Sequence, residues 1–196
     1  GAEEVYIEFE GANSSADVYV NGALAVHHDG GYSTFRANIT SLLKEENEIV
    51  VAVDNAPNDY VYPQMADFTF YGGLYRNVNI ICVPKTHFDL DFWGGPGIQV
   101  TPVVEGCNAN VEVIGYFTGL KGLETVRYTI KDGDTVVAET FVAAANGKAS
   151  FMIENAHLWN GRKDPFLYTL EATLMDGEIV LDDRTVKFGC RFFEID

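Results

Sequence analysis

Carboxylates are the most abundant side chains in this sequence that could carry out chemistry. The 196 residues include 29 Asp and Glu against 13 Lys and Arg, which gives a formal net charge of −16. Cleavage of a glycosidic bond, for example, normally requires two carboxyl groups roughly 5–9.5 Å apart, one of them with a raised pKa. Most acidic residues here lie in turns or adjacent pairs, and only Asp67 is embedded in an aromatic, apolar segment. One carboxylate does not make a catalytic pair, so we predict no catalytic residue in this chain.

Other combinations of reactive side chains are weaker. Gly94-Gly95-Pro96-Gly97 is followed by neither Lys-Ser nor a helix, so it predicts a bend instead of a phosphate-binding loop. Neighbouring strand residues point to opposite faces, so His27-His28-Asp29 is interpreted as an exposed polar loop at a hairpin end, not as a metal site. His87, Asp89 and Asp91 would share one face of a strand, where a solvated polar face explains them as well as a cation does. We therefore predict no metal site and no cofactor.

The acidic charge excludes several classes of partner. Neutralising the phosphates of nucleic acid, or an anionic membrane surface, requires clustered Lys and Arg, and those present are scattered. No apolar run approaches the roughly 20 residues of a membrane-spanning helix. We predict neither a nucleic-acid nor a membrane partner.

The three cysteines, Cys82, Cys107 and Cys190, have neither close pairing nor the spacing of a metal site. An odd number at wide spacing favours free, mostly buried thiols, as in a reducing compartment such as the cytoplasm. One disulfide with one free thiol is the alternative.

Alternation of apolar and polar residues with a period of two, bounded by turn residues, predicts an all-β chain. Asn21-Gly22 between two alternating runs is the strongest hairpin signal, since both residues tolerate a positive φ. A helical turn capped by a hydroxyl is expected at residues 40–44, and Gly72-Gly73 introduces a long apolar strand over residues 74–83. The other strands of this part are expected at residues 5–9, 18–20, 23–26, 35–39 and 48–53.

Pro84-Lys85 interrupts this pattern, and we place a domain boundary there, with domains at residues 1–84 and 85–196. The second domain has turn signals at intervals of roughly 8–12 residues, which is typical of an immunoglobulin-like sandwich. Its strands are expected at residues 88–92, 98–104, 110–117, 126–130, 136–142, 167–174 and 178–186.

Several segments of the first domain resemble the non-catalytic modules of glycoside hydrolase family 2. Residues 18–22 (V-Y-V-N-G) are similar to the family's V-x-V/L-N-G hairpin, and residues 30–35 (G-G-Y-S-T-F) to its G-G-Y/H-x-x-F segment. The most specific segment is D-F-T-F-Y-G-G-L-Y-R-N-V at residues 67–78, which is similar to the sugar-binding domain's D-x-x-x-x-G-G-I-Y/F-R-x-V signature. Each motif alone is weak, but their order and spacing together are specific.

The second domain carries the same resemblance. His157-Leu158-Trp159 followed by Pro165-Phe166-Leu167-Tyr168 is similar to the family's L-W-x(n)-P-x-L-Y. Phe188-Gly189-Cys190-Arg191 is similar to the F-G-F/I-R that leads into the catalytic barrel, with Cys190 as a change in side-chain packing. The resemblance covers the chain from Val5 to Asp196.

The resemblance implies two β-sandwich domains: a jelly roll, truncated at its N-terminus, and an immunoglobulin-like domain. A TIM barrel with two catalytic glutamates would begin after Asp196 and would be the partner that this chain scaffolds. Residues 87–102 favour a parent that hydrolyses β-galactosides, while β-glucuronidase- and β-mannosidase-type parents stay open. By its place in the signature, Asp67 is expected to accept hydrogen bonds from sugar hydroxyls at the barrel mouth. The alternative is a loop cap on nearby backbone N–H groups.

Other residues of these motifs are expected to be structural. We expect Arg76 to form an ion pair from within a strand, and Trp159 and Tyr168 to pack in a core or between domains. Only about six strand candidates precede Val83, where a jelly roll needs about eight. We therefore expect an unpaired sheet edge, an uncovered apolar face and self-association into a homo-oligomer through the first domain.

Two further classes of function stay open. A stand-alone carbohydrate-binding module would need aromatic side chains that face solvent beside polar groups. The candidates, which we expect mostly to be buried by their neighbours, are Tyr60, Tyr62, Phe68, Phe70 and Tyr71. A cell-surface adhesion module is the third class, and it does not require the signature at residues 67–76.

Overall fold

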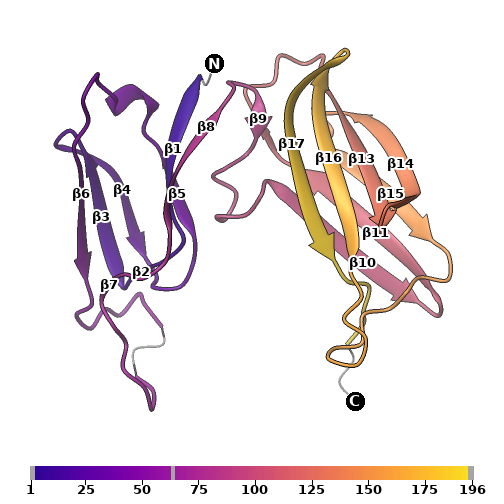
Figure 1. Ribbon diagram of the computed structural model, residues 1–196, viewed down its shortest axis with the longest axis horizontal. Helices are drawn as coiled ribbons and strands as arrows, with labels where there is room; N and C mark the ends of the chain where they lie inside the picture. Colours follow the sequence, from indigo (N-terminus) through magenta and orange to yellow (C-terminus); the bar gives the residue numbers. More distant parts are fainter. Residues whose placement is uncertain (1–2, 63–64, 194–196) are drawn as a thin grey trace. The chain divides into compact units, whose positions relative to one another are not determined.

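The computed structural model describes residues 3–62 and 65–193, and it confirms the predicted all-β class (Figure 1). The outer ends of the two predicted domains, residues 1 and 196, lie outside these ranges. The chain divides into two compact units: unit 1 comprises Gly1–Lys85 and Leu90–Gly95, and unit 2 comprises Thr86–Asp89 and Pro96–Asp196. The described residues form no helix that is long and apolar enough to span a membrane.

The described residues of unit 1 form six longer strands and two strands of two residues. The strands are β1 (Glu4–Phe9), β2 (Ala12–Asn13), β3 (Ser15–Val20), β4 (Ala23–Asp29), β5 (Phe35–Asn38), β6 (Ile49–Asp54), β7 (Gly73–Leu74) and β8 (Val78–Val83). They form two three-stranded sheets, ordered β5-β1-β8 and β4-β3-β6, and the pair β2-β7 (Figure 1). The hairpin predicted at Asn21-Gly22 is present, and the two residues have φ values of 52° and 83°.

The core of unit 1 lies between its two three-stranded sheets. Every second residue of β3 is buried there, because successive strand residues face opposite sides. A helical turn forms at η1 (Thr40–Leu42), but the predicted hydroxyl cap is wrong, since no side chain caps this turn. The Thr40 hydroxyl instead accepts a hydrogen bond from the Val5 N–H at 2.8 Å, which ties the turn to β1.

The edges of these sheets leave part of the sandwich interior uncovered. Within the described residues β6 and β8 pair on one side only. Val78 and Ile80 of β8 pair with the buried Phe9 and Ile7 of β1 and therefore point to the same face. Their exposed fractions are nevertheless 44% and 55%, and that of Ile49 on β6 is 41%. These apolar side chains and the outer edges of β6 and β8 are thus open to solvent.

We expect this open side to drive self-association of the 196-residue chain, because free edges pair with other strands and exposed apolar strips associate. Light scattering should give a mass above that of the monomer that rises with concentration. Ile80→Lys should lower this mass, whereas Leu123→Lys, at an exposed loop position of unit 2, should not. A monomer at high concentration for the unsubstituted chain would contradict the prediction.

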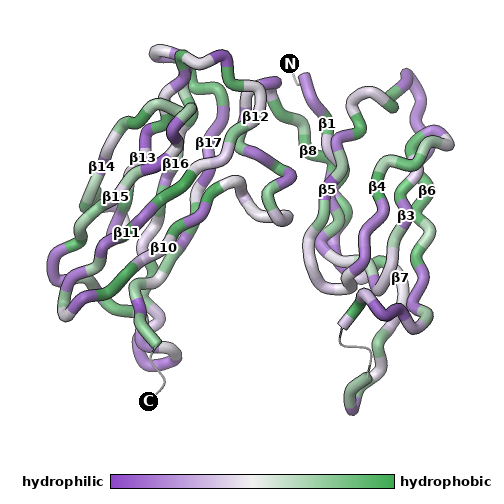
Figure 2. Tube along the Cα trace, turned by 180° about the vertical axis from the view of Figure 1, so that it is seen from behind, coloured by the Kyte–Doolittle hydropathy of each residue, from purple (hydrophilic) through white to green (hydrophobic). Residues whose placement is uncertain are grey.

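Unit 2 is a sandwich of a three-stranded and a four-stranded sheet. Its strands are β9 (His87–Phe88), β10 (Ile98–Glu105), β11 (Asn108–Gly115), β12 (Phe117–Thr118), β13 (Thr125–Asp132), β14 (Thr135–Ala143), β15 (Lys148–Ile153), β16 (Tyr168–Asp176) and β17 (Ile179–Phe188). The sheets are ordered β10-β11-β15 and β14-β13-β16-β17, with β9 and β12 as a separate pair. Figure 2 shows hydrophobic and hydrophilic residues alternating along these strands. This is the architecture that the immunoglobulin-like prediction describes.

Tyr128 on β13 is the largest fully buried side chain of this core. Its hydroxyl donates a hydrogen bond to the Gly147 carbonyl oxygen at 2.8 Å, and burial holds its pKa far above the ordinary value. Gly115 makes room for that hydroxyl, because a Cβ there would clash with it.

All three thiols are free, but only Cys190 is buried, and burial raises its pKa. Cys82 and Cys107 are exposed. The expectation of mostly buried thiols is therefore wrong, since both lie on outer strand or turn positions.

Candidate functional site

Asp67 lies in the loop between β6 and β7 of unit 1, residues 55–72. Its side chain is exposed, and no hydrogen bond joins the carboxylate to another residue of the ranges 3–62 and 65–193. Within the part of the chain that the structure describes, the carboxylate therefore keeps acceptor capacity for further donors.

Aromatic side chains of the same loop also face solvent. The exposed fractions of Tyr60, Tyr62 and Tyr71 are 88%, 94% and 76%, and that of Phe68 is 64%. Phe70 is half-buried, with its ring centroid 4.9 Å from that of Phe68. The prediction that most of these rings are buried by their neighbours is wrong, because no described part of unit 1 covers them.

The loop is fixed to the body of unit 1 near both of its ends. Near its start, the Asn58 amide donates to Ser15 Oγ at 2.8 Å and to Asp29 Oδ1 at 2.9 Å. Near its end, the buried Asn13 amide donates to the Tyr71 carbonyl oxygen at 2.7 Å. Asp67 is therefore carried between two anchored points.

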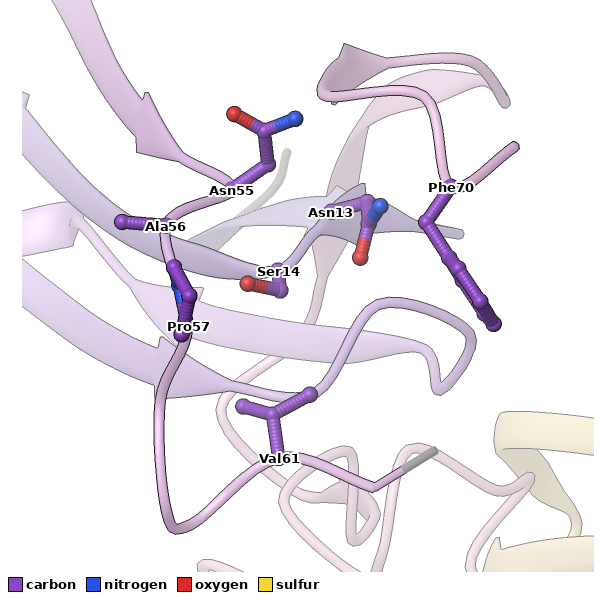
Figure 3. Close-up of a pocket in the computed structure, with 7 residues that line it drawn as sticks. All are labelled: Asn13, Ser14, Asn55, Ala56, Pro57, Val61 and Phe70. Atoms are coloured by element: carbon purple, nitrogen blue, oxygen red, sulfur yellow. The ribbon is translucent and has the colours of Figure 1, made fainter. Parts of the chain in front are cut away.

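A small pocket lies at the base of this loop. Figure 3 shows Asn55, Ala56 and Pro57 on one side, Phe70 on the opposite side, and Asn13 and Ser14 between them. The cavity has a volume of about 80 Å³. Since one water takes up roughly 30 Å³ of the liquid, the cavity could hold a hydroxyl-sized substituent but not a sugar ring.

The glycines and the arginine of the signature at residues 67–78 shape the end of the loop. A Cβ at Gly72 would lie 2.9 Å from Asn55 Cγ, and Gly73 has a φ of 100° that other residues rarely adopt. Arg76 lies between β7 and β8, where it donates to the carbonyl oxygens of Tyr32 at 2.9 Å and Glu10 at 3.2 Å. The predicted ion pair from within a strand is therefore wrong, since Arg76 binds backbone carbonyls from a break between strands.

His27 and His28 lie within β4 and not in a loop, which corrects the sequence-based interpretation. His27 is held between two carboxylates, with Nδ1 2.7 Å from Asp17 and Nε2 3.2 Å from Asp29. His28, the next residue along the strand, points to the opposite face of the sheet, where its ring stacks on Phe35 at a centroid distance of 4.2 Å. No group of three or more His, Cys, Asp or Glu within the described ranges could hold a metal ion.

We expect the two neighbouring histidines to titrate on opposite sides of the ordinary pKa of about 6.5. Hydrogen bonds to Asp17 and then Asp29 raise the pKa of His27, whereas burial lowers that of His28. Protonated His27 therefore stabilises the fold below pH ~6.5, and this stabilisation is lost as the pH rises through its raised folded-state pKa. His28 acts in the opposite sense, because its protonation opposes folding as the pH falls through ~6.5. An NMR titration assigned with His27→Gln and His28→Gln tests this order, and a His27 value at or below 6.5 would contradict it.

The prediction that one strand carries His87, Asp89 and Asp91 on a single face is also wrong. The strand β9 contains only His87 and Phe88, and Asp91 belongs to the segment Leu90–Gly95 of unit 1. The chain turns after β9 because the Asp89 N–H bonds to the Tyr116 carbonyl oxygen at 2.9 Å. The three side chains do not share a strand face.

Of the two aromatic residues of the second-domain motif, Tyr168 packs in a core as predicted, whereas Trp159 lies outside the core cluster. Tyr168 is buried in the core of unit 2, and its hydroxyl accepts a hydrogen bond from the His157 N–H at 2.9 Å. Trp159 is half-buried, and the Arg191 guanidinium lies 5.1 Å from the centroid of its ring.

Comparison with known proteins identifies the family. Residues 1–84 match "Glycosyl hydrolases family 2, sugar binding domain", and residues 97–191 match "Glycosyl hydrolases family 2". The chain belongs to glycoside hydrolase family 2.

Individual relatives carry two different names. A β-glucuronidase of Bacteroides fragilis is 30% identical over 99% of this chain and 30% of its own length. A β-galactosidase of Thermoanaerobacter pseudethanolicus is 30% identical over 98% of this chain and 26% of its own length. The chain therefore spans less than a third of the length of these relatives.

Solved structures agree with the fold. The crystal structure of an FMN-binding β-glucuronidase from Faecalibacterium prausnitzii L2-6 matches 95% of this chain and 29% of its own, with 41% identity and a TM-score of 0.88. A β-glucuronidase from Bacteroides uniformis matches 98% of this chain and 25% of its own, with 28% identity and a TM-score of 0.82.

Proposed function

We propose that this chain forms the sugar-binding and immunoglobulin-like domains of a β-glycosidase, and that Asp67 contacts the sugar. The observation that carries the proposal is an exposed carboxylate without a hydrogen-bond partner in the described ranges, on a loop anchored at Asn58 and Tyr71. An ionised carboxylate accepts hydrogen bonds only, and it can hold two sugar hydroxyls at once.

The exposed aromatic rings of the loop suit the same role. Tyr60, Tyr62, Phe68 and Tyr71 would meet the remainder of the whole protein, the proposed catalytic barrel, and exclude water around Asp67. Exposed apolar surface of this kind marks a protein or ligand interface. A carboxylate in a partly dry pocket binds hydroxyls more strongly than it does in water.

The two reacting carboxyl groups would come from elsewhere in the whole protein. The pKa values of Asp29 and Glu124 are lowered: a hydrogen bond from Ser15 lowers that of Asp29, and backbone N–H groups led by Lys121 lower that of Glu124. A general acid needs the opposite shift. The chain would therefore position sugar without breaking its bond.

For the sugar itself we propose a β-galactoside, following the segment at residues 87–102. A β-glucuronide is the second candidate, because the structural relative at 41% identity and the Bacteroides fragilis relative both have β-glucuronidase in their names.

Kinetics of the whole protein on matched 4-nitrophenyl β-galactoside and β-glucuronide test this function. We expect turnover of at least one substrate, and the ratio of the two kcat/KM values decides the sugar. Absence of turnover on both, and on the β-mannoside, would overturn the glycosidase proposal.

A stand-alone carbohydrate-binding module is a second candidate function, which the exposure of four aromatic rings on one loop favours. Calorimetry of the 196-residue chain with methyl β-galactoside distinguishes the two. Binding that is lost in both Tyr62→Ala and Phe68→Ala would support the module.

A further inference from the structure

We propose a second carbohydrate-binding site in unit 1, at a groove beside Trp93, where the indole face stacks on a neutral sugar ring. The groove lies on a different loop from Asp67, and the proposal does not depend on the function proposed above.

Trp93 is presented to solvent in an unusual way. It lies in the segment Leu90–Gly95, which returns to unit 1, and 89% of the side chain is exposed. Tryptophan is highly buried on average in folded proteins, because its large apolar ring gains the most from leaving water. A nearly bare indole is therefore a candidate contact for a ligand.

The segment that carries Trp93 is held in place from both ends. Arg36 Nη1 donates to the carbonyl oxygens of Leu90 at 2.9 Å and Gly95 at 2.7 Å. The Arg36 Nε atom pairs with Glu8 at 2.6 Å, and both side chains are only about a tenth exposed. The backbone at Gly94 also packs closely against the backbone at Thr34, because a Cβ at Gly94 would clash with the Thr34 carbonyl oxygen.

The anchored backbone of the segment Leu90–Gly95 favours binding of a ligand at Trp93. Because the backbone of this segment is already ordered, a ligand does not have to order it, which lowers the entropic cost of binding. The buried Leu90, which packs with Tyr6 and Val83, fixes the start of the segment in the same way.

The groove beside the ring has the size and the polar groups of a small-ligand site. Its volume is about 350 Å³, within the roughly 300–1,000 Å³ usual for such sites. Polar groups are supplied by Ser33, His28 and Asp91, which line it with Trp93. The Ser33 hydroxyl lies 3.1 Å from His28 Nε2, whose ring is fixed by stacking on Phe35.

The chemistry of this lining favours a neutral sugar. An aromatic face takes up the C–H face of a pyranose, while hydroxyl and carboxylate oxygens hydrogen-bond its hydroxyl groups. The Arg36 charge is already paired with Glu8, and its Nε and Nη1 atoms donate to Glu8 and to two carbonyl oxygens, so little of its attraction is left for a uronate or a phosphate. Asp91 would in addition repel an anion.

An NMR titration of the 196-residue chain tests the proposal, since the two tryptophans give two indole N–H signals. We expect methyl β-galactoside to shift the Trp93 signal saturably, with a Kd in roughly the millimolar range. Methyl β-glucuronide should bind at least roughly tenfold more weakly because of its carboxylate. Trp93→Ala should abolish saturable binding at this site as followed by calorimetry, and Trp93→Phe should retain part of it.

Two controls keep this site separate from the Asp67 loop. Tyr62→Ala removes an equally exposed aromatic ring from that loop and should leave the Trp93 shift unchanged. A Trp93 signal that stays constant in the presence of sugar, or affinity that is the same in Trp93→Ala, would overturn the proposal. Hydrolysis by the whole protein bears on the proposed function alone, so the two can fail independently.

Discussion

In the whole protein, Asp67→Ala is expected to lower kcat/KM by roughly 100-fold or more. If the hydroxyl contacts of Asp67 strengthen as the reacting sugar distorts, their loss removes that transition-state stabilisation. A 100-fold loss corresponds to about 2.7 kcal/mol. Steady-state kinetics on the better of the two aryl glycosides measure it.

Two variants show whether the effect belongs to this carboxylate. Asp67→Asn keeps one acceptor oxygen and should fall between the unsubstituted protein and Asp67→Ala. Asp134→Ala removes an exposed carboxylate from the turn between β13 and β14 and should be neutral. Unchanged kinetics in Asp67→Ala would leave Asp67 as a loop residue without a role in sugar binding.

Much of the fold could be predicted because local signals and tertiary structure agree. Two-residue turns such as Asn21-Gly22 set both the turn and the register of the flanking strands. The strand β15 was missed because its apolar alternation is short and Met152 points outward at 59% exposed. The apolar run at residues 74–83 predicts one strand, but β7 pairs with β2 and β8 pairs with β1, so the strand is interrupted where the partner changes.

The candidate site was predictable only in part. The motif makes Asp67 a candidate, and its role stays a prediction. The apolar composition of the loop predicts buried rings, but the rings are exposed, because composition does not show what covers a side chain. Arg76 was assigned an ion pair from its charge, although backbone carbonyls take its donors. The sequence does not predict the groove beside Trp93, because Arg36, which holds the segment Leu90–Gly95 on unit 1, lies 54 residues before Leu90.

The chain alone is expected to hydrolyse no glycoside, and this is the largest effect that the account predicts. Glycoside hydrolysis needs an acid and a nucleophile or base at a fixed separation, and without both the barrier stays close to that of the uncatalysed reaction. Asp29 and Glu124 are held ionised by hydrogen bonds and are not poised to give up a proton near neutral pH. Sugar binding at Asp67 or at Trp93 would not change this outcome.

The direct test compares hydrolysis of 4-nitrophenyl β-galactoside and β-glucuronide by the purified 196-residue chain and by the whole protein. We predict turnover by the whole protein and a rate for the chain that equals the buffer blank, even at a thousandfold higher chain concentration. A rate that scales with the amount of chain and persists through a further purification step would contradict the assignment of this chain as a sugar-positioning part of a glycosidase.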